Sequence, residues 1–116
     1  MVCSTQFTLA PDRVAVREAR QRVRTFTDLP QELASNAELV VSELVANSVL
    51  HAHLGPDDLI EITLWRDERR LHIEVDDHGG FSGRPRHKGG LGFRVLDALC
   101  EDWRAEGGRV SASLRF

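Results

Sequence analysis

The sequence predicts an α+β fold of two layers, a sandwich in which helices cover one face of a mainly antiparallel sheet. Three observations lead to this prediction. Apolar residues recur at helical intervals in three segments, and they alternate with polar residues in four others. The predicted elements follow in the order strand, two helices, hairpin, loop, helix, strand, which favours helices packed on an antiparallel sheet. Because no repeat, low-complexity tract or linker interrupts the 116 residues, we expect one domain over residues 1–116.

The first half of the chain is predicted to hold one strand and two helices. Alternation around Phe7 predicts a short strand over residues 5–9. Pro11 suits the first turn of a helix, and apolar residues at helical intervals predict one over residues 14–26. The strongest helical pattern of the chain covers residues 32–52 and stops before a Gly-Pro-Asp turn.

The second half is predicted to form a hairpin, a long loop, a helix and a last strand. Apolar and polar residues alternate on both sides of a short charged turn, as in a hairpin. The next segment is rich in glycine and charge, which is typical of binding loops and lids. The expected bounds are 60–65 and 71–76 for the hairpin strands, 79–92 for the loop, about 91–103 for the helix and 110–116 for the strand.

The composition excludes several classes of protein. Fifteen basic and eighteen acidic residues give a net charge of −3, which offers no general attraction to nucleic acid or to an anionic membrane. No apolar run approaches the roughly 20 residues that span a bilayer, and residues 1–6 lack the features of a signal peptide. Cys3 and Cys100 lie far apart and suggest neither a zinc site nor a disulfide framework. We therefore expect a cytoplasmic protein with reduced thiols.

A polar stripe runs along the second predicted helix. Glu43, Asn47 and His51 are spaced by four residues, so their side chains share one face. A carboxylate, an amide and an imidazole in a row are able to hold a cation or polarise a nucleophile. The alternative interpretation of such spacing is an ordinary solvated helix face.

A carboxylate follows directly after the second hairpin strand. Asp77 has the same parity as Leu71, Ile73 and Val75, so the buried face of the strand runs into this side chain. A carboxylate there needs a hydrogen-bond donor, which the amino group of a bound base supplies. Gly79, two residues later, lets the backbone approach a flat ligand. The alternative is an aspartate that caps an ordinary turn.

A glycine-rich segment opens the third predicted helix. The sequence Lys88-Gly89-Gly90-Leu91-Gly92-Phe93-Arg94 exposes backbone amides at the positive end of the helix dipole, an arrangement suited to polyphosphate. It is not a P-loop, because no Gly-Lys-Ser/Thr follows and no strand leads directly into it. A flexible turn is the alternative.

In this order and at these separations, the three features resemble the nucleotide site of the GHKL (histidine kinase-like) ATPase superfamily. Residues 43–47 are similar to its N box, residues 77–79 to its first glycine box and residues 90–92 to its second. Residues 38–49 and 90–99 look most like those of the anti-sigma-factor serine kinases, the RsbW and SpoIIAB type with their actinobacterial relatives. The resemblance extends from about residue 7 to residue 116.

The resemblance implies a Bergerat-type sandwich that binds ATP and Mg²⁺. Asn47 would coordinate the magnesium ion, Glu43 would be the general base toward a substrate serine, and Asp77 would accept a hydrogen bond from adenine. The other implied nucleotide-binding residues are His51, Gly79, Lys88, Gly90, Leu91, Gly92 and Phe93. The chain departs from the family at Phe81, where the first glycine box usually has a second glycine. Either Gly80 replaces that glycine or the loop has another shape.

The resemblance also implies partners. The expected function is to sequester a sigma factor and to phosphorylate a STAS-domain anti-anti-sigma factor, as a homodimer without direct contact to nucleic acid. The alternative is a module of the same fold that sequesters its partner with little or no turnover.

Overall fold

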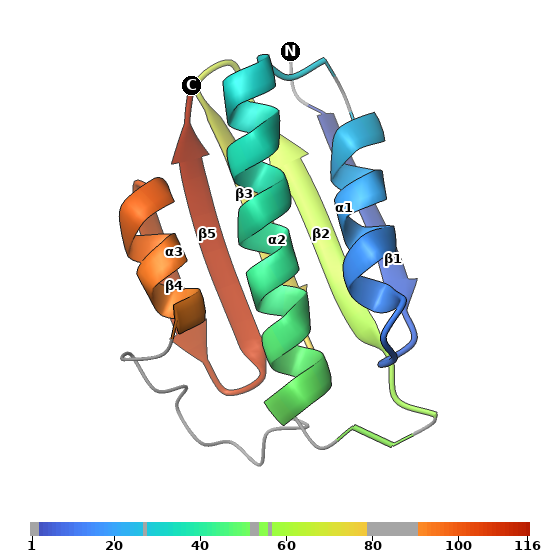
Figure 1. Ribbon diagram of the computed structural model, residues 1–116. Helices are drawn as coiled ribbons and strands as arrows, with labels where there is room; N and C mark the ends of the chain where they lie inside the picture. The colour runs from blue at the N-terminus through green and yellow to red at the C-terminus, as the bar shows by residue number, and fades with distance from the viewer. Residues whose placement is uncertain (1–2, 27, 52–53, 56, 79–90) are drawn as a thin grey trace.

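The architecture is a five-stranded sheet with helices on one face (Figure 1). The computed structural model describes residues 3–26, 28–51, 54–55, 57–78 and 91–116. Every neighbouring pair of strands is antiparallel, in the order β1-β2-β3-β5-β4, so the predicted α+β class is confirmed. The strands are β1 (Cys3–Leu9), β2 (Ile60–Arg66), β3 (Arg70–Asp76), β4 (Asp102–Glu106) and β5 (Arg109–Arg115), and the helices are α1 (Ala15–Thr25), α2 (Gln31–His51) and α3 (Leu91–Leu99).

The hydrophobic core lies between the sheet and the helices. In β2 and β3, buried residues alternate with partly exposed ones, so each strand turns one face to the helices. α2 runs along the sheet between α1 and α3, and it packs against both helices and against β3 and β5. Burying one large aliphatic side chain contributes about 1.5–3 kcal/mol. Fully buried core side chains include Val40, Val41, Leu44, Val45, Ile60, Ile62, Leu64, Leu71, Ile73, Leu96 and Leu114.

α1 is amphipathic, as its sequence pattern predicts. Ala15, Ala19 and Val23 recur every four residues and are buried, while the arginines of the helix are exposed. Arg24 forms an ion pair with Glu38 of α2 at 2.7 Å, which joins the two helices at the surface. Among the described residues, no helix combines the length and the apolarity needed to cross a membrane.

One strand of the sheet was missing from the sequence prediction. The third helix ends at Leu99 rather than near residue 103, and Asp102–Glu106 forms β4. β4 pairs with β5 through a tight turn in which Gly107 has φ of +58°, a conformation that favours glycine. Trp103 is partly buried against the core, and its indole Nε1 donates a hydrogen bond of 2.7 Å to Asp97 of α3. This bond joins the end of α3 to the edge strand.

Candidate functional site

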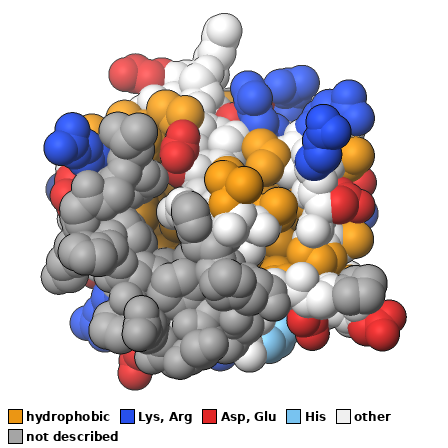
Figure 2. Space-filling model, turned by 60° about the horizontal axis from the view of Figure 1, so that its bottom comes forward, with side chains coloured by type: hydrophobic (Ala, Val, Ile, Leu, Met, Phe, Trp, Pro, Cys, Tyr) orange, Lys and Arg blue, Asp and Glu red, His pale blue; other side chains and the backbone are white. Residues whose placement is uncertain are grey.

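Three elements that carry predicted site residues meet at one end of the molecule. α2 ends, β3 ends and α3 begins at this end, which lies at the bottom of Figure 1. α2 packs against both β3 and α3, so segments that are far apart in the sequence become neighbours. Figure 2 shows this end turned toward the reader. Lys and Arg side chains gather at its upper right, and hydrophobic side chains are exposed beside them.

Asp77 is buried directly after β3 and accepts a hydrogen bond from α2. Its side chain is 2% exposed, and Ser48 Oγ donates to Oδ2 over 3.2 Å. The Asp77 backbone N–H donates to the carbonyl of Gly108 at 2.9 Å, which ties the end of β3 to the β4–β5 turn. The prediction that the buried face of the strand runs into this carboxylate is therefore confirmed. Burial makes a hydrogen-bond donor obligatory, because an ionised carboxylate without one is costly.

Ser48 is a member of this site that the sequence analysis missed. It is 0% exposed and stands on the apolar side of α2, four residues after Leu44 and three after Val45. A hydroxyl at an apolar position of a helix is the signal that could have drawn attention to it. The strand that it faces is apparent only in the fold.

The neighbouring Asp76 shapes the chain where it leaves the sheet. Asp76 points to the opposite face from Asp77, and its Oδ1 accepts a hydrogen bond of 2.7 Å from the backbone N–H of His78. His78 has φ of +58°, uncommon for a residue other than glycine. Arg109 of β5 lies 3.4 Å from Asp76 Oδ2 and adds a charge-assisted contact. These contacts hold the turn that leads away from the end of β3.

Glu43 and Asn47 lie one helical turn apart on α2, and both are partly buried. Glu43 lines a groove of about 340 Å³ between α1 and α2, together with Arg20 and Glu38 among other residues. Asn47 immediately precedes Ser48, so its amide side chain comes from the same turn of α2 as the hydroxyl that binds Asp77. The functional role of the stripe stays a prediction, since neighbouring residues of α2 are partly buried as well. His51 is the last residue of α2, and its side chain lies outside the described part of the chain.

For several predicted site residues the structure describes no side chain. Gly79, Lys88 and Gly90, with Phe81 of the first glycine box, lie outside the described residues. Leu91, Gly92 and Phe93 form the first turn of α3, as predicted, but the structure describes only their backbone as helical. The assignment of these residues to the phosphates therefore stays a prediction.

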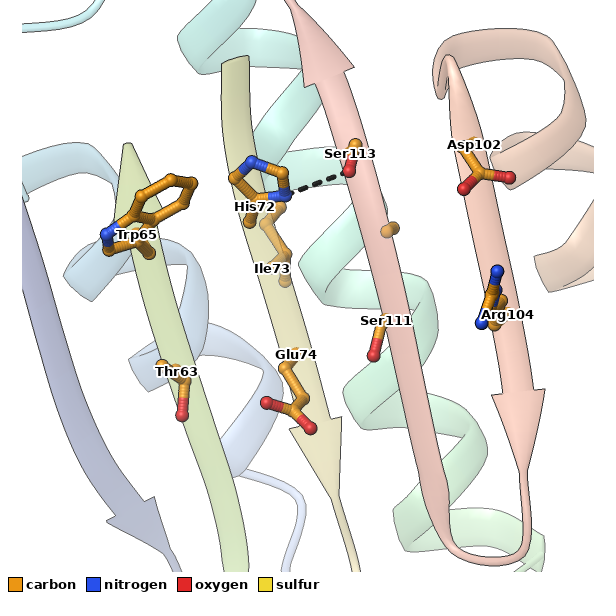
Figure 3. Close-up of a pocket in the computed structure, with 10 residues that line it drawn as sticks. Thr63, Trp65, His72, Ile73, Glu74, Asp102, Arg104, Ser111 and Ser113 are labelled. Carbon is orange, nitrogen blue, oxygen red and sulfur yellow. Dashed lines mark hydrogen bonds between the residues drawn. The ribbon is translucent and has the colours of Figure 1, made fainter. Parts of the chain in front are cut away.

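A separate pocket of about 400 Å³ lies on the face of the sheet that the helices leave open (Figure 3). Trp65 and His72 are in contact there, with ring centroids 4.6 Å apart, and His72 Nδ1 shares a hydrogen bond of 2.9 Å with Ser113 Oγ. These are cross-strand neighbours of the kind that stabilise a sheet. Asp77 is buried on the helix side, so this pocket is distinct from the candidate site.

Comparisons with known proteins agree with this fold. The family model described as "Histidine kinase-like ATPase domain" matches residues 7–114. A crystal structure of the RsbU and RsbW domains of Rv1364c from Mycobacterium tuberculosis has a similar fold, with a TM-score of 0.69 and 19% sequence identity. The alignment covers 97% of this chain and 31% of that one, so the chain spans about a third of the length of its structural neighbour. A search of curated proteins gives no match.

The family model covers almost the whole sheet and all three helices, and its match includes each of the three sequence features at the α2–β3–α3 end. The chain belongs to the histidine kinase-like ATPase domain family.

Proposed function

We propose that this domain binds ATP with Mg²⁺ and acts as a serine/threonine protein kinase of the anti-sigma-factor type. The observation that carries the proposal is the buried Asp77 carboxylate, which accepts a hydrogen bond from Ser48 on the turn of α2 that also carries Asn47. In this proposal Asp77 is the acceptor for a base, Asn47 supplies an oxygen ligand for a hard cation, and Glu43 is the carboxylate that meets the substrate.

The residues of the site are suited to the nucleotide. Asp77 accepts a hydrogen bond from the exocyclic amino group of adenine, because an ionised carboxylate only accepts. Asn47 offers an amide oxygen, and magnesium takes oxygen ligands. We assign the backbone amides that meet the phosphates to Gly90 and to Leu91, Gly92 and Phe93 at the start of α3, and we assign Gly79 to the base. The proposed set also includes His51, and Lys88 as a residue that reaches the terminal phosphate.

Glu43 is the proposed catalytic residue. It lines the groove between α1 and α2, so a partner protein docked there brings a serine hydroxyl next to this carboxylate. Glu43 orients the hydroxyl and accepts its proton while the serine oxygen bonds to the γ-phosphorus of ATP and ADP leaves. The remaining work is positioning and stabilisation of charge.

The proposed partners are a sigma factor, which the domain sequesters, and a STAS-domain anti-anti-sigma factor, which it phosphorylates. The fold shared with a structure described as containing an RsbW domain supports this choice. We further propose a homodimer that works in the cytoplasm without direct contact to nucleic acid, in keeping with the net charge of −3.

A second candidate function is a module that sequesters its partner, with nucleotide setting its shape and little or no turnover. Phe81 favours this candidate, because it stands where the first glycine box usually has a second glycine.

Transfer of radiolabelled phosphate to a matched STAS-domain partner separates the two functions. We expect the wild type to label the partner, and Glu43→Gln to bind ATP normally while transfer falls about 100- to 10,000-fold, the usual effect of removing a general base. Glu32→Gln is the matched control, since Glu32 is exposed in the first turn of the same helix. Wild-type transfer by Glu43→Gln would refute the role of Glu43. Absence of transfer by the wild type with its true partner would favour the sequestering module.

A further inference from the structure

The buried hydrogen bond between Ser48 and Asp77 joins α2 to the end of β3. In the described part of the chain, these two residues are the buried polar side chains, at 0% and 2% exposure. Oγ and Oδ2 are 3.2 Å apart, although the residues are separated by 29 positions in the sequence. Among the residues that the structure describes, the otherwise apolar core therefore holds one polar pair, at the site where the proposed function places the base of ATP.

Ser48 uses its hydroxyl differently from another serine of the same helix. Ser42 Oγ donates to the carbonyl of Glu38, four residues earlier, at 2.7 Å. That local bond is the common way for a serine inside a helix to satisfy its hydroxyl. Ser48 donates across the core to Asp77 instead. Its hydroxyl thus fixes a particular carboxylate rather than the backbone of α2.

The position of the Asp77 carboxylate is determined from two sides. The backbone N–H is bound to Gly108, and the side chain is bound to Ser48. The Ser48 hydroxyl fixes the direction of Oδ2, and a hydrogen bond from this carboxylate to a ligand weakens steeply when its angle is poor. We propose that Ser48 is a positioning residue that orients Asp77 toward the exocyclic amino group of adenine, and so sets the preference for adenine nucleotides. This inference rests on the proposed function.

The direct test is discrimination between ATP and purine riboside triphosphate, which lacks the amino group. We expect the wild type to bind ATP about 10- to 100-fold more tightly, as hydrogen bonds to charged groups allow. In Ser48→Ala this ratio should fall to about threefold or less, because the hydrogen bond that orients Oδ2 of Asp77 is lost. Ser42→Ala, which loses a hydroxyl from the same helix, should keep the wild-type ratio. A purely structural role would lower the thermal midpoint of Ser48→Ala and leave the ratio unchanged.

Two further variants make the test decisive. Ser48→Thr retains the hydroxyl and should keep most of the discrimination. In an Asp77→Asn background, Ser48→Ala should change the ratio no further, since Ser48 acts through Asp77. If the wild type and Ser48→Ala discriminate equally while Asp77→Asn does not, the role of Ser48 is refuted and the proposed nucleotide site stands. If the wild type itself does not discriminate, the assignment of Asp77 in the proposed function fails.

Discussion

At the scale of single residues, Asp77 is the group whose burial most needs an explanation. A carboxylate that is 2% exposed loses most of its hydration, and the fold compensates with the hydroxyl of Ser48. The neighbouring Asp76 faces the other side of the sheet and contacts Arg109. Two adjacent aspartates therefore have opposite surroundings, which makes them a matched pair for mutation.

Asp77→Asn should weaken ATP binding while the domain stays folded. The substituted amide can present its NH₂ group where a carboxylate oxygen accepted a hydrogen bond, and the mismatch costs about 1–3 kcal/mol. Calorimetric titration measures the loss, and circular dichroism checks the fold. Asp76→Asn should bind ATP like the wild type. Equal affinity of the wild-type protein for ATP and GTP would argue against base recognition by Asp77.

Cys100 should be a slow nucleophile in the folded protein. Burial, and secondly the nearby charge of Asp97, raises the pKa of the Cys100 thiol to about 12. Because the thiolate is the reactive form, alkylation by iodoacetamide at pH 8 should be about a hundredfold slower or more than in the unfolded chain. Peptide mass spectrometry distinguishes Cys100 from Cys3. Equal rates of modification in the folded and unfolded protein would contradict this expectation.

At the scale of elements, the long periodic segments were predictable from the sequence. The helical pattern over 32–52 corresponds to α2, and the alternating segments correspond to β1, β2, β3 and β5. Each of these elements has several apolar residues that repeat at the helical or the strand period, so the pattern identifies the type of element. Residues 43–47 lie on α2 and Asp77 lies directly after β3, as predicted, for the same reason.

β4 and Ser48 were not predictable from the same patterns. β4 has only five residues, with Trp103 and Ala105 as its inward side chains, and it follows α3 after two residues. So short an alternation merges with the end of a helical pattern. Ser48 was missed because its partner, Asp77, becomes its neighbour only when the sheet packs on α2. Tertiary contacts decide both cases.

Gly107 is the residue that permits the β4–β5 turn, and replacing it tests that turn. Its φ of +58° lies in the left-handed region, and no atom lies within 4 Å of a Cβ added there. Gly107→Ala should therefore destabilise the fold by about 1 kcal/mol through backbone strain alone. Urea unfolding measures the change. Gly55→Ala is the control, since its Cβ would make an ordinary 3.6 Å contact with Asp58. A Gly107→Ala variant as stable as the wild type would contradict the assigned turn.

At the scale of the whole molecule, the helices and the candidate site share one side of the sheet, and ion pairs lie on the other side. Arg70 of β3 binds Glu101, just before β4, at 2.6 Å. This contact joins the middle of the sheet to its edge on the side away from Asp77. The exposed face thus adds to the cohesion of the sheet without taking part in the proposed chemistry.

Acid should weaken the fold partly through Glu101. The hydrogen bond from Arg70, more than any other contact, holds the pKa of Glu101 below its usual value. A carboxyl group whose pKa is lowered by folding stabilises the protein above its unfolded pKa, and this stability is lost as the pH falls through the folded pKa. Glu101→Gln should be less stable than the wild type at pH 7, and the difference should shrink at about pH 3. Urea unfolding at both pH values measures it, and a difference that does not change with pH would contradict the role of Glu101.

The central claim is that the α2–β3–α3 end of this domain binds ATP with magnesium. Isothermal titration of the wild-type protein with ATP, with and without Mg²⁺, tests it most directly. We predict saturable binding with one ATP per chain, strengthened by Mg²⁺ because Asn47 offers an oxygen ligand to the ion, and much weaker binding of GTP. Absence of saturable ATP binding in the presence of Mg²⁺ would contradict the account.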